Sequence, residues 1–85
     1  MYFVYILKSS QNGTLYIGFT ENITRRLREH NDGISPSTKR YIPWKLVYCE
    51  IYSNREDAKE REKKIKQFGK VYTQLKRRIS RSLKS

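Results

Sequence analysis

The chain has 85 residues, of which 36% are hydrophobic and 32% charged, and this composition suits one small globular domain rather than a disordered chain. Its longest apolar run, residues 3–7, is too short to span a membrane, and no secretory signal is visible, so we expect a soluble cytoplasmic protein. One cysteine and one histidine exclude an internal disulfide and a structural zinc site, and a lone cysteine suits a reducing compartment.

Positive charge is concentrated near the C-terminus. The formal net charge is +11, but residues 1–62 hold ten Lys/Arg and eight Asp/Glu, whereas residues 63–85 hold nine Lys/Arg and no acid. Such a block repels itself unless a polyanion is near. DNA or RNA is therefore the expected partner, and an anionic membrane surface is the weaker alternative.

Two apolar segments near the N-terminus predict an antiparallel β-hairpin. Residues 2–8 and 14–19 are rich in β-branched and aromatic side chains, and Asn12-Gly13 between them is a strong turn signal. Alternation along the strands predicts a core face with Val4, Ile6, Leu15, Ile17 and Phe19. The opposite face carries Tyr5, Leu7, Tyr16 and Gly18, where the glycine leaves room above the sheet.

The length of the hairpin loop decides how close the two phenols come. A two-residue turn would separate Tyr5 and Tyr16 by roughly 13 Å along the strands. A four-residue loop over residues 10–13 would pair Tyr5 with Gly18 and make the phenols diagonal neighbours. We favour the longer loop. Each phenol hydroxyl needs a hydrogen-bond partner once it is buried.

A helix should follow the hairpin, beginning after the N-cap Asn22 and ending at Gly33. Its inward positions, spaced four apart, are Ile23 and Leu27. The bordering stripe, with the same spacing, carries Arg26 and His30. Residues 33–43 contain glycine, proline and serine and predict a mobile loop. Residues 44–52 predict a third strand, in which Cys49 is a packing residue.

A second helix is predicted over residues 53–68. Its start carries a capping-box pattern formed by Ser53 and Glu56. Its short apolar stripe consists of Ala58, Ile65 and Phe68. Glu62 lies within this stripe, where a carboxylate is costly unless it is paired or binds a metal. The structural alternative is a salt bridge to Lys66 or Arg61.

Gly69 should end this helix, and a last helix is predicted over residues 71–83. Its apolar positions recur every four residues, at Val71, Leu75, Ile79 and Leu83. The complete pattern predicts one α/β (α+β) domain over residues 1–85, with a three-stranded antiparallel sheet flanked by helices and a basic C-terminal helix alongside.

The polar residues singled out above supply the parts of metal-assisted phosphodiester hydrolysis. A carboxylate can hold Mg²⁺, a phenol or imidazole can take a proton from water, and an arginine can offset charge on a phosphate. Each also has a structural interpretation: the tyrosines as packing residues, Arg26 as part of a solvated helix face, and His30 as a partner of the helix dipole.

The motifs and their order resemble the GIY-YIG nuclease family, and within it the small single-domain bacterial members. "FVYIL" stands in the place of the first motif, "LYIG" of the second, "NITRRLREHN" of the arginine helix and "DAKEREKKIK" of the glutamate helix. The resemblance covers nearly the whole chain. Two positions depart from the family pattern: Phe3 replaces the glycine of the first motif, and Phe19 replaces a lysine that some relatives carry after "YIG".

The resemblance implies a metal-dependent DNA endonuclease that uses one Mg²⁺ or Mn²⁺ ion and no small-molecule cofactor, with a role such as DNA repair. It implies the catalytic residues Tyr5, Tyr16, Arg26 and His30. The metal ligand would be Glu62, whereas Glu60 would point elsewhere. We expect the nucleic-acid backbone to contact Arg25, Lys39, Arg40, Lys70, Lys76, Arg77 and Arg81.

Two other classes of function remain as alternatives. The first is a nucleic-acid-binding module that keeps this fold but cleaves poorly or not at all. The second is a membrane-surface or protein-interaction protein built on the amphipathic helix at residues 71–83. That helix has no Trp or Phe on its apolar stripe, which the domain needs for packing.

Overall fold

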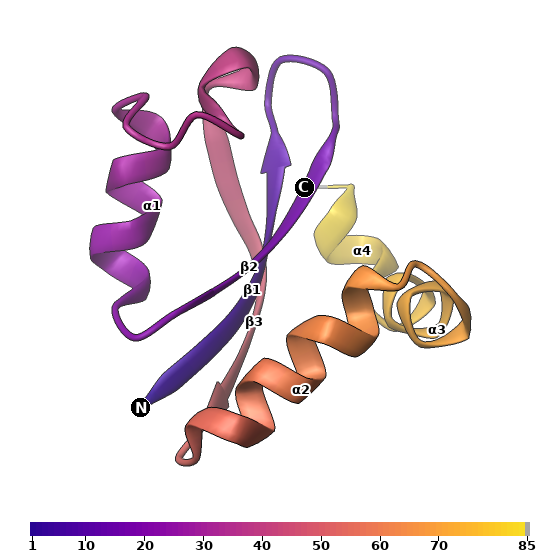
Figure 1. Ribbon diagram of the computed structural model, residues 1–85. Helices are drawn as coiled ribbons and strands as arrows, with labels where there is room; N and C mark the ends of the chain where they lie inside the picture. The colour runs from indigo at the N-terminus through magenta and orange to yellow at the C-terminus, as the bar shows by residue number, and fades with distance from the viewer. Residues whose placement is uncertain (85) are drawn as a thin grey trace.

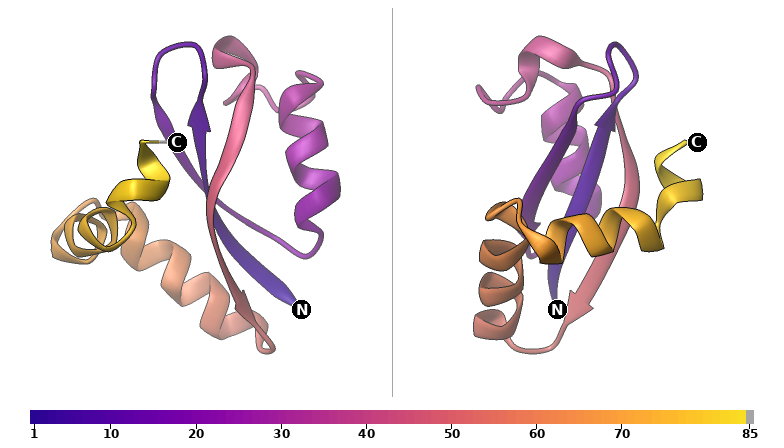
Figure 2. Two further views of the ribbon diagram at one scale, coloured as in Figure 1. Left: turned by 180° about the vertical axis from the view of Figure 1, so that it is seen from behind. Right: turned by 90° about the vertical axis from the view of Figure 1, so that its right-hand side faces the viewer.

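The computed structural model describes residues 1–84, and Ser85, the last residue of the expected domain, lies outside the described residues. A three-stranded antiparallel sheet of order β2-β1-β3 forms the middle layer, with strands β1 (Tyr2–Ser9), β2 (Leu15–Thr20) and β3 (Trp44–Tyr52). One face is covered by α1 (Ile23–Asn31). The other is covered by α2 (Arg55–Lys66), α3 (Lys70–Arg78) and α4 (Ser80–Leu83), as Figures 1 and 2 show. The predicted fold class is therefore confirmed.

The hairpin has the predicted four-residue loop. Tyr5 pairs with Gly18, and Leu7 pairs with Tyr16. The loop closes where the backbone N–H of Ser9 donates to the carbonyl of Thr14 at 2.8 Å. This register puts both phenols on the same face of the sheet, toward α1.

The two faces of the sheet pack against chemically different layers. The α2–α4 side is an aliphatic core, formed by Val4, Ile6, Ile17, Ala58, Ile65, Leu75 and Ile79. The α1 side is smaller and aromatic, formed by Tyr5, Leu7 and Trp44 with flanking Tyr16, Ile23 and Leu27. Cys49 is half-buried at this second cluster and serves as a packing residue. No helix within residues 1–84 combines the length and apolarity needed to cross a membrane.

The segment between α1 and β3 is more ordered than its composition predicts. It contains a 3₁₀ turn, η1 (Lys39–Tyr41), and two buried hydroxyl residues, Ser35 and Thr38. The Trp44 indole N–H donates to the Thr38 carbonyl at 2.7 Å, and Asn31 bonds the Trp44 backbone on both sides. The predicted loop is present, and its buried polar groups all find partners inside the domain; its mobility stays a prediction.

Two details of α2 differ from the sequence prediction. Its N-cap is Asn54 rather than Ser53, because the Asn54 side chain accepts the backbone N–H of Asp57 at 3.1 Å. Phe68 does not extend the apolar stripe but is 62% exposed. It follows the helix end with a φ of 56°, whereas Ala58 and Ile65 are fully buried as expected.

The predicted last helix is broken into α3 and α4. The break falls at Ile79, whose φ of −107° and ψ of 26° are not helical. The apolar residues of the predicted stripe still pack on the aliphatic core on both sides of the break. The spacing therefore predicted the buried side chains correctly and missed the bend between them.

Candidate active site

Gly18 of β2 and Tyr5 of β1 fit together as a pair. A Cβ added at Gly18 would lie 2.3 Å from the Tyr5 hydroxyl oxygen, closer than any real contact. Only glycine therefore allows the Tyr5 ring to lie across β2, where the side chain is 1% exposed. The space expected above Gly18 is present, but the phenol of Tyr5 itself fills it.

A chain of hydrogen bonds leads from this phenol into the domain. The Tyr5 hydroxyl is 2.9 Å from Nε2 of His30, and Nδ1 of His30 is 2.7 Å from Oγ1 of Thr38. Thr38 Oγ1 reaches the carbonyl of Ser35 at 3.5 Å, and a carbonyl only accepts. We therefore assign the proton of His30 to Nδ1, which leaves Nε2 to accept from the Tyr5 hydroxyl.

Burial keeps both ends of the first bond uncharged near neutral pH. Burial, together with the positive charge of Arg26, lowers the pKa of His30 to about 4. Burial also raises the pKa of Tyr5 to about 12, against the effect of a hydrogen bond with Arg26. His30 is thus a neutral imidazole whose free nitrogen faces a phenol proton.

Arg26 faces the site and its neighbour Arg25 does not. The Arg26 guanidinium bonds Glu29 at 3.1 Å, reaches Ser35 at 3.4 Å and contacts the Tyr5 hydroxyl. Burial acts against its charge, but the bonds to Glu29 and Tyr5 raise its pKa overall. The Arg25 side chain is 64% exposed, with a 3.9 Å ion pair to Glu29 as its contact. The predicted pairing of Arg26 with His30 on one stripe is thus present.

Tyr16 lies beside these groups and reaches solvent. Its ring centroid is 5.1 Å from that of His30, 6.4 Å from Tyr5 and 6.2 Å from Trp44. Its side chain is half-buried, whereas Tyr5 and His30 are fully enclosed. Tyr16 is consequently the phenol of the pair that an incoming molecule can reach.

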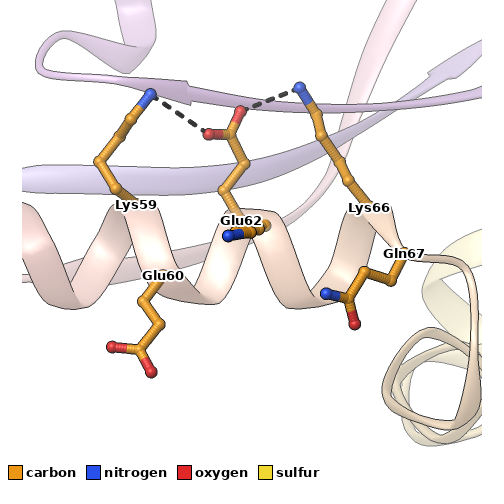
Figure 3. Close-up of a pocket in the computed structure, with 6 residues that line it drawn as sticks. Lys59, Glu60, Glu62, Lys66 and Gln67 are labelled. Atoms are coloured by element: carbon orange, nitrogen blue, oxygen red, sulfur yellow. Dashed lines mark ion pairs between the residues drawn. The ribbon is translucent and has the colours of Figure 1, made fainter.

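Glu62 projects from α2 toward the sheet and is held between two lysines, as Figure 3 shows. Its carboxylate is 3.0 Å from Nζ of Lys66 and 3.5 Å from Nζ of Lys59, and its side chain is 13% exposed. Lys66 is one of the two salt-bridge partners that the sequence predicted for Glu62 as the structural alternative to metal binding. The other, Arg61, instead binds Glu50 through two nitrogens at 2.9 and 3.0 Å.

Glu60 takes the opposite direction from Glu62. Its side chain points away from the sheet in Figure 3, is 67% exposed and pairs with Lys64 at 3.4 Å. Glu62, by contrast, is close enough to Tyr5 to affect its pKa. Burial is the main cause that raises the pKa of Tyr5, and the negative charge of Glu62 acts in the same direction. The two acids are therefore well matched as site residue and control.

A divalent cation would have Glu62 as its carboxylate ligand here. No group of three or more His, Cys, Asp or Glu side chains within residues 1–84 could enclose a metal ion. Mg²⁺ is commonly held by one or two carboxylates together with waters and substrate phosphates, so the lone carboxylate fits such a shared site. Lys59 and Lys66 would have to release the carboxylate, and phosphate oxygens would suit their charges.

Sequence reasoning missed two parts of this arrangement. Lys59 lies 4.7 Å over the ring of Phe19 while pairing with Glu62, so an ammonium from α2 stands beside the residue that follows "YIG". Its spacing of three residues from Glu62 could have indicated this pair. Thr38, the partner of His30, had no signal in the sequence, because a loop threonine is typically solvated.

The predicted nucleic-acid contacts do not form one patch. Arg25 lies on α1, and Lys39 and Arg40 lie in η1, on one side of the sheet (Figure 1). The remainder lie on α3 and α4 on the other side: Lys70, Lys76, Arg77 and Arg81. In sequence, the residues of a groove on α2 come between the two groups. The groove is lined by Lys59, Glu60, Glu62, Lys63, Lys66 and Gln67.

Comparison with known proteins places the chain in a family. Residues 1–76 match the family described as the GIY-YIG catalytic domain. A UPF0213 protein of Clostridium perfringens is 42% identical over 67 residues, which cover 78% of this chain and 71% of that protein. A UPF0213 protein of Staphylococcus haemolyticus is 40% identical over 70 residues, with 81% and 84% covered. The solution NMR structure of a UPF0213 protein from Bacillus halodurans is similar with a TM-score of 0.54 at 27% identity, covering 88% of this chain and 81% of that one.

Proposed function

This chain belongs to the GIY-YIG family, and we propose that it is an endonuclease that hydrolyses phosphodiester bonds of DNA with the help of one divalent cation. The observation that carries the proposal is the hydrogen bond from the Tyr5 hydroxyl to Nε2 of His30, with the Arg26 guanidinium close enough to act on the pKa of Tyr5. This arrangement places a phosphate-binding cation beside a phenol and the proton acceptor of that phenol. Packing alone requires neither a neutral buried imidazole nor an arginine at its edge.

In this proposal the proton of the attacking water leaves through Tyr5. The Tyr5 oxygen takes that proton as its own passes to Nε2 of His30, which becomes an imidazolium held at Nδ1 by Thr38. Because Tyr5 is almost fully enclosed, the water approaches along Tyr16, whose side chain reaches solvent. When the product leaves, His30 returns its proton to Tyr5, Tyr5 releases the proton taken from the water to solvent, and the leaving oxygen takes a proton from solvent.

Arg26 and Glu62 act on the phosphate from the two sides of β2. Arg26 has five N–H donors, and its bonds to Glu29, Ser35 and Tyr5 leave others to offset charge that develops on the phosphate. Glu62 would hold Mg²⁺ or Mn²⁺, which supplies Lewis-acid stabilisation of the leaving oxygen. Lys59 and Lys66 keep Glu62 paired until the phosphate arrives.

The alternative of a binding module that cleaves poorly rests on one observation. Two lysines already neutralise Glu62, and a carboxylate in tight ion pairs competes poorly for a cation. The basic residues of α3 and α4 would bind nucleic acid equally well in either case. The two functions differ only in whether the bound strand is cut.

Labelled DNA separates the two functions. We expect the pure protein to cut branched, nicked or linear DNA with Mg²⁺ or Mn²⁺ and to cut none of them in EDTA. Binding without cleavage of any of these substrates, at any concentration of either cation, would instead assign the protein to the binding module. A matched experiment with Tyr5→Phe removes the hydroxyl while keeping the ring over Gly18, and cleavage should be lost.

A further inference from the structure

Phe68 is held in an unusual position between α2 and α3. It is 62% exposed, and it is the one non-glycine residue with a positive φ among residues 1–84. Its backbone N–H bonds the carbonyl of Ile65 at 3.1 Å, which is the bond made by the left-handed residue that ends a helix. Glycine favours that position, yet the glycine of this turn is one residue later, at Gly69.

The ring of Phe68 is supported without being covered. It meets the ring of Tyr72 edge to face, with centroids 5.0 Å apart and planes at 82°. Tyr72 is itself fixed against the aliphatic core, and Nζ of Lys76 lies 4.5 Å over its ring. An exposed aromatic ring held in place by a second ring is the arrangement that protein surfaces use to stack a nucleobase.

Charge around the ring favours a polyanion as the partner. Residues 63–85 contain nine Lys/Arg and no acid, so no carboxylate of this segment would repel a phosphate. Phe68 follows the α2 groove, which includes Lys66 and Gln67, as Figure 3 shows. Glu62 is six residues earlier, on α2, the helix that Phe68 follows.

We propose that Phe68 stacks on an unpaired nucleobase and so gives the protein a preference for strands with exposed bases. In a continuous duplex the faces of the bases are covered by their neighbours, and this ring would have nothing to stack on. A link between this ring and the cut phosphate rests on the proposed function, but the stacking itself does not. An apolar partner surface is less suited, because the segment that carries the ring, residues 63–85, has nine Lys/Arg and no acid.

Binding in EDTA tests the proposal without cleavage. Fluorescence anisotropy would compare a labelled oligothymidine with a duplex of the same length, using Phe68→Leu, which keeps an apolar side chain and removes the aromatic face. We expect about a tenfold loss of affinity for the single strand and no change for the duplex. Ile51→Ala is the matched control, since Ile51 is 59% exposed on β3 and should leave both affinities unchanged.

Phe68→Trp provides a second readout. It should restore single-strand affinity, and the oligothymidine should quench its fluorescence, whereas the native Trp44 is 5% exposed and should not respond. Equal losses on single strand and duplex would overturn the proposal, as would no loss on either. Loss of binding to anionic lipid vesicles by Phe68→Leu, with DNA binding intact, would assign the ring to a membrane surface instead.

The two proposals fail separately. If no DNA is cut but Phe68→Leu weakens single-strand binding, the stacking site stands and the nuclease function does not. If DNA is cut but Phe68→Leu binds single strands like the native chain, the stacking site alone is wrong.

Discussion

Two polar networks, one on each face of the sheet, both use a pair of tyrosines, and their difference separates stability from chemistry. On the α2 side, Glu50 accepts from Tyr48, Tyr52 and the Nε and Nη2 of Arg61. All four of these donors are directed at the one carboxylate. On the α1 side, the phenol of Tyr5 ends at a neutral imidazole, and the neighbouring arginine keeps donors for another molecule.

The closed network should be the one whose loss unfolds the domain. The lone pairs of Glu50 are filled by four donors, so the network ties β3 to α2 but offers nothing to a substrate. The open network has an unprotonated nitrogen, Nε2 of His30, that already accepts from the Tyr5 phenol and can take its proton. Substitutions on the two sides should therefore give opposite results: loss of stability on one, loss of activity on the other.

The largest effect is expected at Arg61. Arg61→Met removes the cation from Glu50 and leaves a carboxylate that is 16% exposed with phenols as its only bonds. Breaking a buried ion pair from one side is costly, so the free energy of unfolding should fall by about 2–4 kcal/mol. Urea unfolding measures it. Lys64→Met, which removes the exposed pair with Glu60, should change stability by less than about 0.5 kcal/mol.

Next in size is the effect of Arg26→Ala on cleavage. We expect the cleavage rate to fall about 100- to 1,000-fold, because a charge that acts on the reacting phosphate acts mainly in the transition state. DNA affinity should change little, since one phosphate contact is lost among many. Gel-based cleavage and binding assays measure the two effects. Arg25→Ala is the control, and an equal loss of cleavage there would show that Arg26 is the wrong arginine.

The free energy of unfolding should depend on pH because His30, in the open network, is buried as a neutral imidazole. Its pKa is lowered by burial from 6.5 to about 4, so the unfolded chain binds more protons between those values. Stability is then complete above pH 6.5 and falls as the pH drops toward 4, by an amount on the order of 3 kcal/mol.

His30→Gln isolates this contribution. Urea unfolding at pH 7 and pH 4.5 should show a smaller drop for the variant than for the native chain. Glu50, whose pKa is lowered by the bonds from Arg61 and its two tyrosines against the effect of burial, loses its contribution below pH 4.5 and leaves this window clear. An equal drop in both proteins would mean that His30 is not buried as a neutral imidazole.

Sequence patterns predicted what depends on local spacing. Alternation in the hairpin assigned each side chain of β1 and β2 to its face, and the four-residue period assigned Ile23, Leu27 and the last apolar stripe. The placement of Arg26 beside His30 followed from the same period. These features depend only on neighbours in the chain, which is why they can be read before the fold is known.

The other features of the fold and the site depend on contacts between residues far apart in the chain, which the spacing of residue types does not indicate. Thr38 is buried because the segment after α1 folds back over His30, and nothing in its glycine-, proline- and serine-rich composition indicates that return. Phe68 counted as apolar and therefore as core, although its left-handed backbone turns it outward. Ser53 and Asn54 are both good caps, and only the geometry of the turn after β3 selects the second.

A small effect on stability is expected at Glu62, where the effect on cleavage should be large. Glu62→Gln keeps the shape and removes the charge that a cation needs, so metal-dependent cleavage should be lost. In the absence of metal the carboxylate is paired with Lys59 and Lys66, which are 47% and 44% exposed. Such pairs contribute little, so the free energy of unfolding should change by less than about 1 kcal/mol.

Thermal melts with and without Mg²⁺, beside a cleavage assay, measure both effects for Glu62→Gln and for the control Glu60→Gln. Glu60 is 67% exposed, so its variant should melt and cleave like the native chain. A Glu62→Gln protein that melts several degrees lower and still cuts DNA would make Glu62 a structural partner of Lys66. The metal would then have to bind elsewhere, and Glu62, like Arg61 on the same helix, would serve stability rather than chemistry.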